Sequence, residues 1–118
     1  MLQIFHNNRC GKSRNCLSQL ESSGKQFEII SYLTSPPTAE ELKIVLQKLS
    51  LSPIEIVRQK EKLWIDKYSE KTLSDEEIIN ILVHNPILIE RPILVSEDKA
   101  IIAREDDKIE NFLKIQTF

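Results

Sequence analysis

The chain has 118 residues, of which 41% are hydrophobic and 29% charged, and its formal net charge is −2. This composition is typical of one globular domain that buries its core without disulfides or a structural metal, and it does not favour nucleic-acid binding. No apolar stretch approaches the roughly 18 residues that a membrane-spanning helix needs. Because a histidine and two asparagines lie within the first eight residues, we expect no signal peptide, no membrane association and a cytoplasmic location.

The first third of the chain predicts a strand, a helix and a second strand. Residues 2–6 alternate in hydropathy, as a strand does, and residues 27–31 form the second apolar run. Residues 13–23 between them carry apolar side chains at helical spacing. Gly24 follows, and glycine suits the left-handed conformation in which many helices end.

The middle of the chain predicts helices. Thr38 and Ser74 are each followed three residues later by glutamate, which is the pattern of a capping box, and each precedes apolar residues at helical spacing. A short helical turn is predicted over residues 53–57, Pro86 ends the helix that follows Ser74, and the polar segment 61–69 gives no clear prediction. The residues expected on the buried faces of the two capped helices are Leu42, Val45, Leu46, Leu49, Ile78, Ile81 and Leu82.

The last third of the chain predicts a hairpin and a helix. Residues 93–95 and 100–103 are short apolar runs separated by a charged turn at residues 97–99. Asp106 or Asp107 begins the final helix, whose apolar residues are Ile109, Phe112 and Leu113.

The order of these elements is β-α-β, a helical stretch and then β-β-α. This is the plan of an α/β protein with a thioredoxin-like or glutaredoxin-like fold. We therefore expect a single domain over residues 1–118. Its core is expected from about residues 1–35 and 86–118, with a helical insertion over about residues 36–85.

The most informative motif is Cys10-Gly11-Lys12-Ser13, which lies between the first predicted strand and the first predicted helix. The first backbone N–H groups of a helix have no intrahelical partner, and together with the helix dipole they favour a thiolate or a bound anion. Gly11 has no Cβ, so the backbone can approach an anion closely. This turn predicts a nucleophilic cysteine beside a site for an oxyanion.

Residues 6–15, which read His-Asn-Asn-Arg-Cys-Gly-Lys-Ser-Arg-Asn, resemble the active-site loop of the glutaredoxin-dependent arsenate reductases. That loop reads His-Asn-Pro-x-Cys-Gly-Thr-Ser-Arg, so Asn8 stands in place of proline and Lys12 in place of threonine. Residues 32–38 are similar to another segment of the family. Residues 85–93 resemble its signature of a hydrophobic strand followed by Arg-Pro-Ile. The resemblance covers nearly the whole chain.

The resemblance implies a role for each matching residue. Cys10 is the implied nucleophile, and His6 and Pro92 are implied to support it, the proline through a cis peptide bond. Guanidinium groups hold tetrahedral oxyanions by paired hydrogen bonds without losing their charge. The residues expected to bind the substrate are Arg58, Arg91, Arg104, Gly11, Lys12 and Ser13.

The implied reaction is the reduction of arsenate to arsenite. The Cys10 thiolate attacks arsenic(V) and water leaves, glutathione then attacks the adduct, and glutaredoxin completes the reduction. We expect no bound metal, flavin or nicotinamide, with glutathione acting as a co-substrate. The second cysteine, Cys16, would lie roughly 9 Å further along a helix. A disulfide needs a shorter separation, so we expect Cys16 to be buried and inert.

Two other functions are also compatible with the sequence. A glutathione-dependent thiol/disulfide oxidoreductase would use the same fold and the same Cys10, but it would not require three arginines around an oxyanion. A transcription regulator of the Spx type shares the superfamily and senses oxidation through a Cys-x-x-Cys pair. Ser13 occupies the position of the second cysteine of that pair, so the redox switch is missing here.

Overall fold

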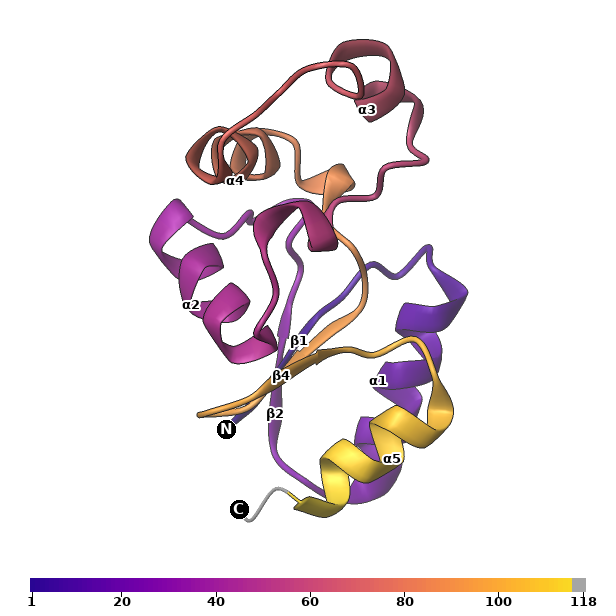
Figure 1. Cartoon of the computed structure of the whole chain (residues 1–118). Coiled ribbons are helices and arrows are strands. Elements are labelled where there is room, and N and C mark those ends of the chain that lie inside the picture. The colour runs from indigo at the N-terminus through magenta and orange to yellow at the C-terminus, as the bar shows by residue number, and fades with distance from the viewer. Residues whose placement is uncertain (116–118) are drawn as a thin grey trace. The chain divides into compact units, whose positions relative to one another are not determined.

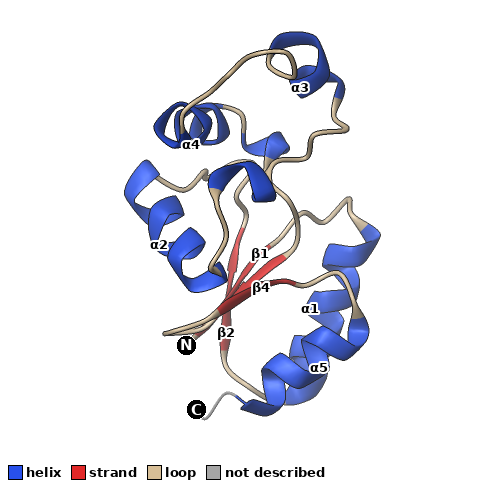
Figure 2. Cartoon of the chain, viewed as in Figure 1, coloured by secondary structure: helices blue, strands red, loops and turns tan. Residues whose placement is uncertain are grey.

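In a computed structural model, which describes residues 1–115, the chain forms four strands and several helices (Figures 1 and 2). Its contacts divide it into two compact units. The sheet unit consists of Met1–Ser35 with the chain from Arg91 onward, and the helical unit consists of Pro36–Glu90. That the two units are one domain with an insertion stays a prediction.

The sheet unit is built on one four-stranded sheet in the order β2-β1-β3-β4. β1 pairs in parallel with β2, whereas the β1–β3 and β3–β4 pairs are antiparallel. Because β1 and β2 run in parallel, the loops that follow them leave the same edge of the sheet. The strands are β1 (Leu2–Phe5), β2 (Phe27–Ile30), β3 (Ile93–Val95) and β4 (Ala100–Ile102).

Two helices complete the sheet unit, α1 (Gly11–Ser23) and α5 (Asp106–Ile115), and they pack against one another (Figure 2). α1 begins at Gly11, earlier than predicted, and Gly24 ends it with a φ of 73°, as predicted. α5 begins at Asp106, one of the two predicted starts. Their apolar faces and the sheet enclose one hydrophobic cluster that contains Leu2, Ile4, Cys16, Leu20, Leu94, Ala103, Ile109 and Phe112.

The helical unit contains three α-helices and two short 3₁₀ turns, all within Pro36–Glu90. The predicted capping boxes are both formed: the hydroxyls of Thr38 and Ser74 accept the N–H groups of the glutamates three residues on, at 3.1 and 3.2 Å. These boxes begin α2 and α4, which pack on one another. The elements are α2 (Ala39–Leu49), η1 (Pro53–Ile56), α3 (Lys62–Lys67), α4 (Asp75–His84) and η2 (Pro86–Leu88).

The structure refines several sequence predictions in the helical unit. The predicted buried faces of α2 and α4 are buried except at Leu49, which is partly exposed, and Ile79 is buried as well. Residues 61–69, which gave no clear prediction, contain the short helix α3 around the buried Trp64. The hydrophobic strand implied before Arg91 is absent, because residues 86–88 form a 3₁₀ turn and only Ile89 makes a β-bridge, with Val57. No helix within residues 1–115 is long and apolar enough to cross a membrane.

Candidate active site

Cys10 is the N-cap residue of α1 and is half-buried. Its backbone is extended, with φ −98° and ψ 122°, so its side chain lies beside the first turn of the helix. The Cys10 N–H donates to the carbonyl of Asn7 at 3.0 Å, and the Cys10 carbonyl accepts the N–H of Arg14 at 3.0 Å. The earlier start of α1 therefore places the thiol at the helix N-terminus, where unpaired N–H groups and the dipole favour negative charge.

The pKa of the Cys10 thiol lies below that of an ordinary cysteine. Partial burial opposes ionisation and raises the pKa. The N–H of Ser13, the charge of Arg91, the N–H of Lys12 and the charge of Arg104 all lower it, and together they outweigh burial. The lowered pKa raises the fraction of Cys10 that is present as thiolate, which is the nucleophilic form of cysteine.

A buried hydroxyl organises the loop before Cys10. Ser13 has no exposed surface, and its Oγ accepts the N–H of Asn7 at 2.9 Å and lies 2.7 Å from Nδ1 of His6. Burial lowers the pKa of His6, a hydrogen bond with Ser13 raises it, and the Arg14 charge lowers it, with a net lowering. A neutral His6 can accept a hydrogen bond from the Ser13 hydroxyl at Nδ1, while the same Oγ accepts a hydrogen bond from the N–H of Asn7. The backbone N–H of Ser13 therefore lowers the pKa of Cys10, whereas its hydroxyl forms hydrogen bonds with Asn7 and His6 in the loop.

Arg14 is a further organising residue, with a role that its place in the loop sequence does not reveal. Its guanidinium donates to the carbonyl of Asn8 at 3.1 Å, and the N–H of Arg9 donates to the side-chain oxygen of Asn7 at 2.9 Å. Asn8 stands where related loops have proline, so these bonds restrain a backbone that lacks a ring. The loop resemblance includes Arg14, but only the loop's three-dimensional path shows which carbonyl it reaches.

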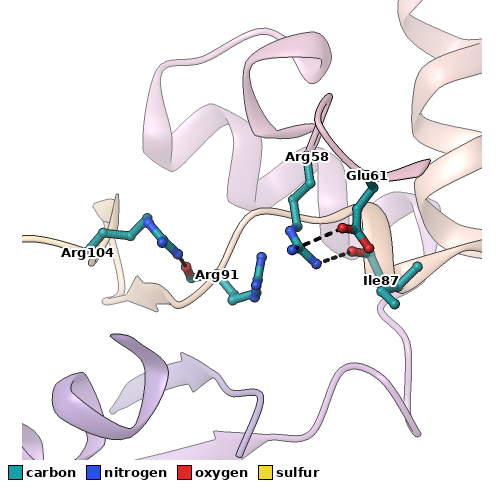
Figure 3. Close-up of polar contacts among 5 residues, drawn as sticks. All are labelled: Arg58, Glu61, Ile87, Arg91 and Arg104. Carbon is teal, nitrogen blue, oxygen red and sulfur yellow. Dashed lines mark hydrogen bonds and ion pairs between the residues drawn. The ribbon is translucent and has the colours of Figure 1, made fainter. Parts of the chain in front are cut away.

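The structure brings two of the three predicted arginines together with Cys10. Nη1 of Arg104 donates to the carbonyl of Arg91 at 2.6 Å, which links the chain after β4 to the chain before β3 (Figure 3). Both charges act on the Cys10 thiol. Nε of Arg91 is buried and has no hydrogen-bond partner among the described residues. A buried donor without a partner costs free energy, which a bound anion would recover.

Arg58, the third predicted arginine, belongs to the helical unit. Its Nη1 donates to the carbonyl of Ile87 at 3.1 Å and its Nη2 lies 3.3 Å from a carboxylate oxygen of Glu61 (Figure 3). Its guanidinium is half-buried and is held by its own unit. A role for Arg58 in substrate binding stays a prediction.

The remaining predicted residues lie in the loop and next to Arg91. Gly11 and Lys12 are exposed in the first turn of α1. Pro92 is buried, and the Arg91–Pro92 peptide bond is cis, as the resemblance implied. Within residues 1–115, no group of three or more histidine, cysteine, aspartate and glutamate side chains could hold a metal ion.

Cys16 has the opposite environment to Cys10. It has no exposed surface and packs in the hydrophobic cluster beneath α1. Burial raises its pKa to about 12. The predicted burial of Cys16 is confirmed, and as a neutral thiol in an apolar core it is a poor nucleophile.

Comparisons with known proteins link nearly the whole chain to one family. The ArsC family matches residues 5–112. The chain is 36% identical over 114 residues to an arsenate reductase of Neisseria meningitidis serogroup A, covering 95% of this chain and 97% of that protein. It is 39% identical over 110 residues to the uncharacterized protein YfgD of Escherichia coli K12, covering 92% of each. The solved structure of an arsenate reductase from Vibrio cholerae superposes with a TM-score of 0.84 at 36% identity, covering 98% of this chain and 97% of that one.

Proposed function

Because this chain belongs to the ArsC family and has its thioredoxin-like α/β fold, we propose that it reduces arsenate to arsenite with glutathione and glutaredoxin as reductants. The observation that carries the proposal is the environment of Cys10. The thiol lies at the N-terminus of α1, and its pKa is lowered by first-turn N–H groups and by Arg91 and Arg104. Arg91 also holds a buried donor that has no partner within residues 1–115. These features support the proposal that a nucleophile lies beside a binding site for an anion.

The proposed first step is capture of the oxyanion. Arsenate carries one to two negative charges at neutral pH, and the guanidinium groups of Arg91 and Arg104 would bind its oxygens. The Cys10 thiolate attacks arsenic, and an S–As bond forms. One hydroxyl of arsenate takes up a proton and leaves as water. The N–H groups of Lys12 and Ser13 would stabilise negative charge that builds up beside the sulfur.

The proposed second step transfers two electrons. The thiolate of glutathione attacks the Cys10 sulfur, an S–S bond forms and the S–As bond breaks. The bonding pair stays on arsenic, which is thereby reduced from arsenic(V) to arsenic(III) and leaves as arsenite. Glutaredoxin then removes glutathione from the mixed disulfide and restores the Cys10 thiol. Because this cycle needs a pool of reduced thiols, we propose that the protein works in the cytoplasm.

The proposal is tested by arsenate-dependent NADPH oxidation in an assay coupled through glutathione, glutathione reductase and glutaredoxin. The wild-type protein should turn over only when arsenate and glutaredoxin are both present. Cys10→Ser should reduce the rate to background, because serine supplies no thiolate. Turnover that persists in a folded Cys10→Ser protein would contradict the mechanism.

A second variant separates arsenate reduction from disulfide exchange. Arg91→Ala should lower kcat/KM for arsenate by about a hundredfold, as removal of one anion-stabilising donor does elsewhere. The same variant should change activity on a glutathione mixed disulfide much less, because that substrate lacks an oxyanion. Lys114→Ala removes a solvent-exposed charge that pairs with Glu110 on α5 and serves as the matched control. Equal losses with both substrates would favour a thiol/disulfide oxidoreductase.

A further inference from the structure

Reduction of a Cys10 adduct requires a second thiol, and the chain offers none that is accessible. It contains two cysteines. The second, Cys16, has no exposed surface and a pKa of about 12, so it can neither reach Cys10 nor ionise near neutral pH. The attacking thiol therefore comes from another molecule, which has to bind close to Cys10.

We infer that the pocket formed by residues 6–9 with Ser31, Leu33 and Thr34 binds glutathione as the thiol that attacks the Cys10 adduct. This inference rests on the proposed function. The pocket has a volume of about 350 Å³, within the range of roughly 300–1,000 Å³ that small-molecule sites occupy. It belongs entirely to the sheet unit, and neither Arg91 nor Arg104 lines it. Thiol and oxyanion would thus bind to different groups.

The pocket lies beside the loop that leads into Cys10, and its lining ends at Arg9, the residue before Cys10 in the chain. Its first wall is the loop after β1, which leads directly into Cys10, and the carbonyl of Asn7 in this wall accepts the Cys10 N–H at 3.0 Å. Its second wall is the loop after β2. The two loops leave the same sheet edge, and the N–H of His6 joins them by donating to the carbonyl of Ile30 at 2.9 Å. A molecule in the pocket therefore lies next to the loop that carries the nucleophile.

The second wall is held in place before any ligand binds. The Ser31 carbonyl accepts the N–H groups of Thr34 and Ser35 at 3.1 and 2.9 Å and the hydroxyl of Thr34 at 3.2 Å. Tyr32, within this turn, is buried and stacks on Phe5 with ring centroids 6.3 Å apart. A preformed wall lowers the conformational entropy that a ligand loses on binding.

The chemistry of the lining suits glutathione, a tripeptide thiol with two carboxylates and two amide bonds. Arg9 is exposed, and within residues 1–115 its guanidinium makes no ion pair or hydrogen bond, while no acidic residue lines the pocket. Arg9 can therefore bind a carboxylate by a charge-assisted pair of hydrogen bonds. The amide of Asn8 and the hydroxyl of Ser31 can bind peptide groups. Leu33, which is 38% exposed, offers an apolar contact for the aliphatic part of the ligand.

This arrangement would deliver the thiol for the electron-transfer step. The bound thiolate attacks the Cys10 sulfur, the S–As bond breaks with its electron pair remaining on arsenic, and arsenite leaves. The product at Cys10 is a mixed disulfide with glutathione still in the pocket. Glutaredoxin, acting on the glutathione sulfur, then releases Cys10 as a thiolate.

The first test is steady-state kinetics with Arg9→Ala and Leu33→Asp, both changes on the surface. Arg9→Ala should raise the KM for glutathione about tenfold, the loss expected for one charge-assisted hydrogen bond. Leu33→Asp should also raise it, because it replaces an apolar contact by a charge that repels the ligand's carboxylates. Both variants should leave the KM for arsenate within about twofold. Lys114→Ala, which removes a charge from a different groove between α1 and α5, should change neither constant. An unchanged KM for glutathione in both variants would overturn the inference, as would a change confined to the KM for glutaredoxin.

The second test does not depend on turnover. S-methylglutathione cannot attack an adduct, and its titration should shift the backbone amide signals of residues 6–9 and 31–34 in the wild-type NMR spectrum. Arg9→Ala should weaken this binding by a similar factor. If arsenate turnover were absent but these shifts occurred, the proposed function would be contradicted and the glutathione site would be supported. If turnover occurred without the shifts, the glutathione site would be contradicted and the proposed function would not.

Discussion

The start and the middle of α1 carry the same residue type in opposite chemical states. Cys10 at the start is half-buried, faces first-turn N–H groups and the charges of Arg91 and Arg104, and has a lowered pKa. Cys16 in the middle is enclosed by apolar side chains, and burial raises its pKa to about 12. The difference indicates that the pKa of a thiol depends on its position along the helix and on the charges that surround it.

The largest difference should appear in the rates of alkylation. In native protein at neutral pH, we expect iodoacetamide to label Cys10 at least about a thousandfold faster than Cys16. A thiol with a pKa of about 12 is ionised to less than about one part in ten thousand at pH 7, and Cys16 has no exposed surface. Timed labelling followed by peptide mass spectrometry measures both sites. In concentrated urea the two rates should become similar, whereas similar rates in native protein would contradict the comparison.

A smaller effect should follow from removing the charges near Cys10. Positive charge stabilises the thiolate, so its loss raises the pKa, and the midpoint of Cys10 alkylation should move to higher pH. Arg91→Ala should move it further than Arg104→Ala, because the Arg91 charge has the larger influence on the thiol. The pH dependence of the alkylation rate gives these midpoints. Lys114→Ala should leave the midpoint unchanged. If neither arginine variant changed the midpoint, the lowered pKa of Cys10 would have to come from the helix N-terminus alone.

The smallest effect is expected from replacing the buried thiol. Cys16→Ala should lower the free energy of unfolding by on the order of 1–2 kcal/mol, because it leaves a small cavity in the hydrophobic cluster. Cys16→Ser should cost more, since it places a hydroxyl in an apolar site. Urea unfolding measures both values. Arsenate turnover of the folded Cys16→Ala protein should match the wild type, and its loss would identify Cys16 as a resolving thiol.

Much of the secondary structure could be predicted because its signals are local. The capping boxes at Thr38 and Ser74 and the left-handed Gly24 each depend on backbone groups within a few residues. The sequence pattern predicts the start of α1 two residues too late, because the residues directly after Cys10 are polar and carry no hydrophobic periodicity. The 3₁₀ turn at residues 86–88 is not predicted either, because its apolar residues resemble those of a strand.

The candidate site was predicted in its residue types and only in part in its geometry. The local sequence predicts that Cys10 lies at the start of a helix, and the family resemblance predicts that Arg91 and Arg104 bind the anion. The bonds that order the loop were missed. Ser13 reaches back to His6 and Asn7, and Arg14 reaches back to Asn8, along a path that no periodicity describes.

By itself, the sequence determined the family, the order of elements and the position of Cys10 at a helix N-terminus, since these follow from short-range patterns and motifs. Only the tertiary structure decided that Arg104 reaches the carbonyl of Arg91 and that both charges act on Cys10. It also decided that the loops after β1 and β2 form one pocket. The physical reason is that electrostatic interaction and cavity shape depend on distances through space, which the pairing of β1 with β2 and β3 sets between residues far apart in the chain.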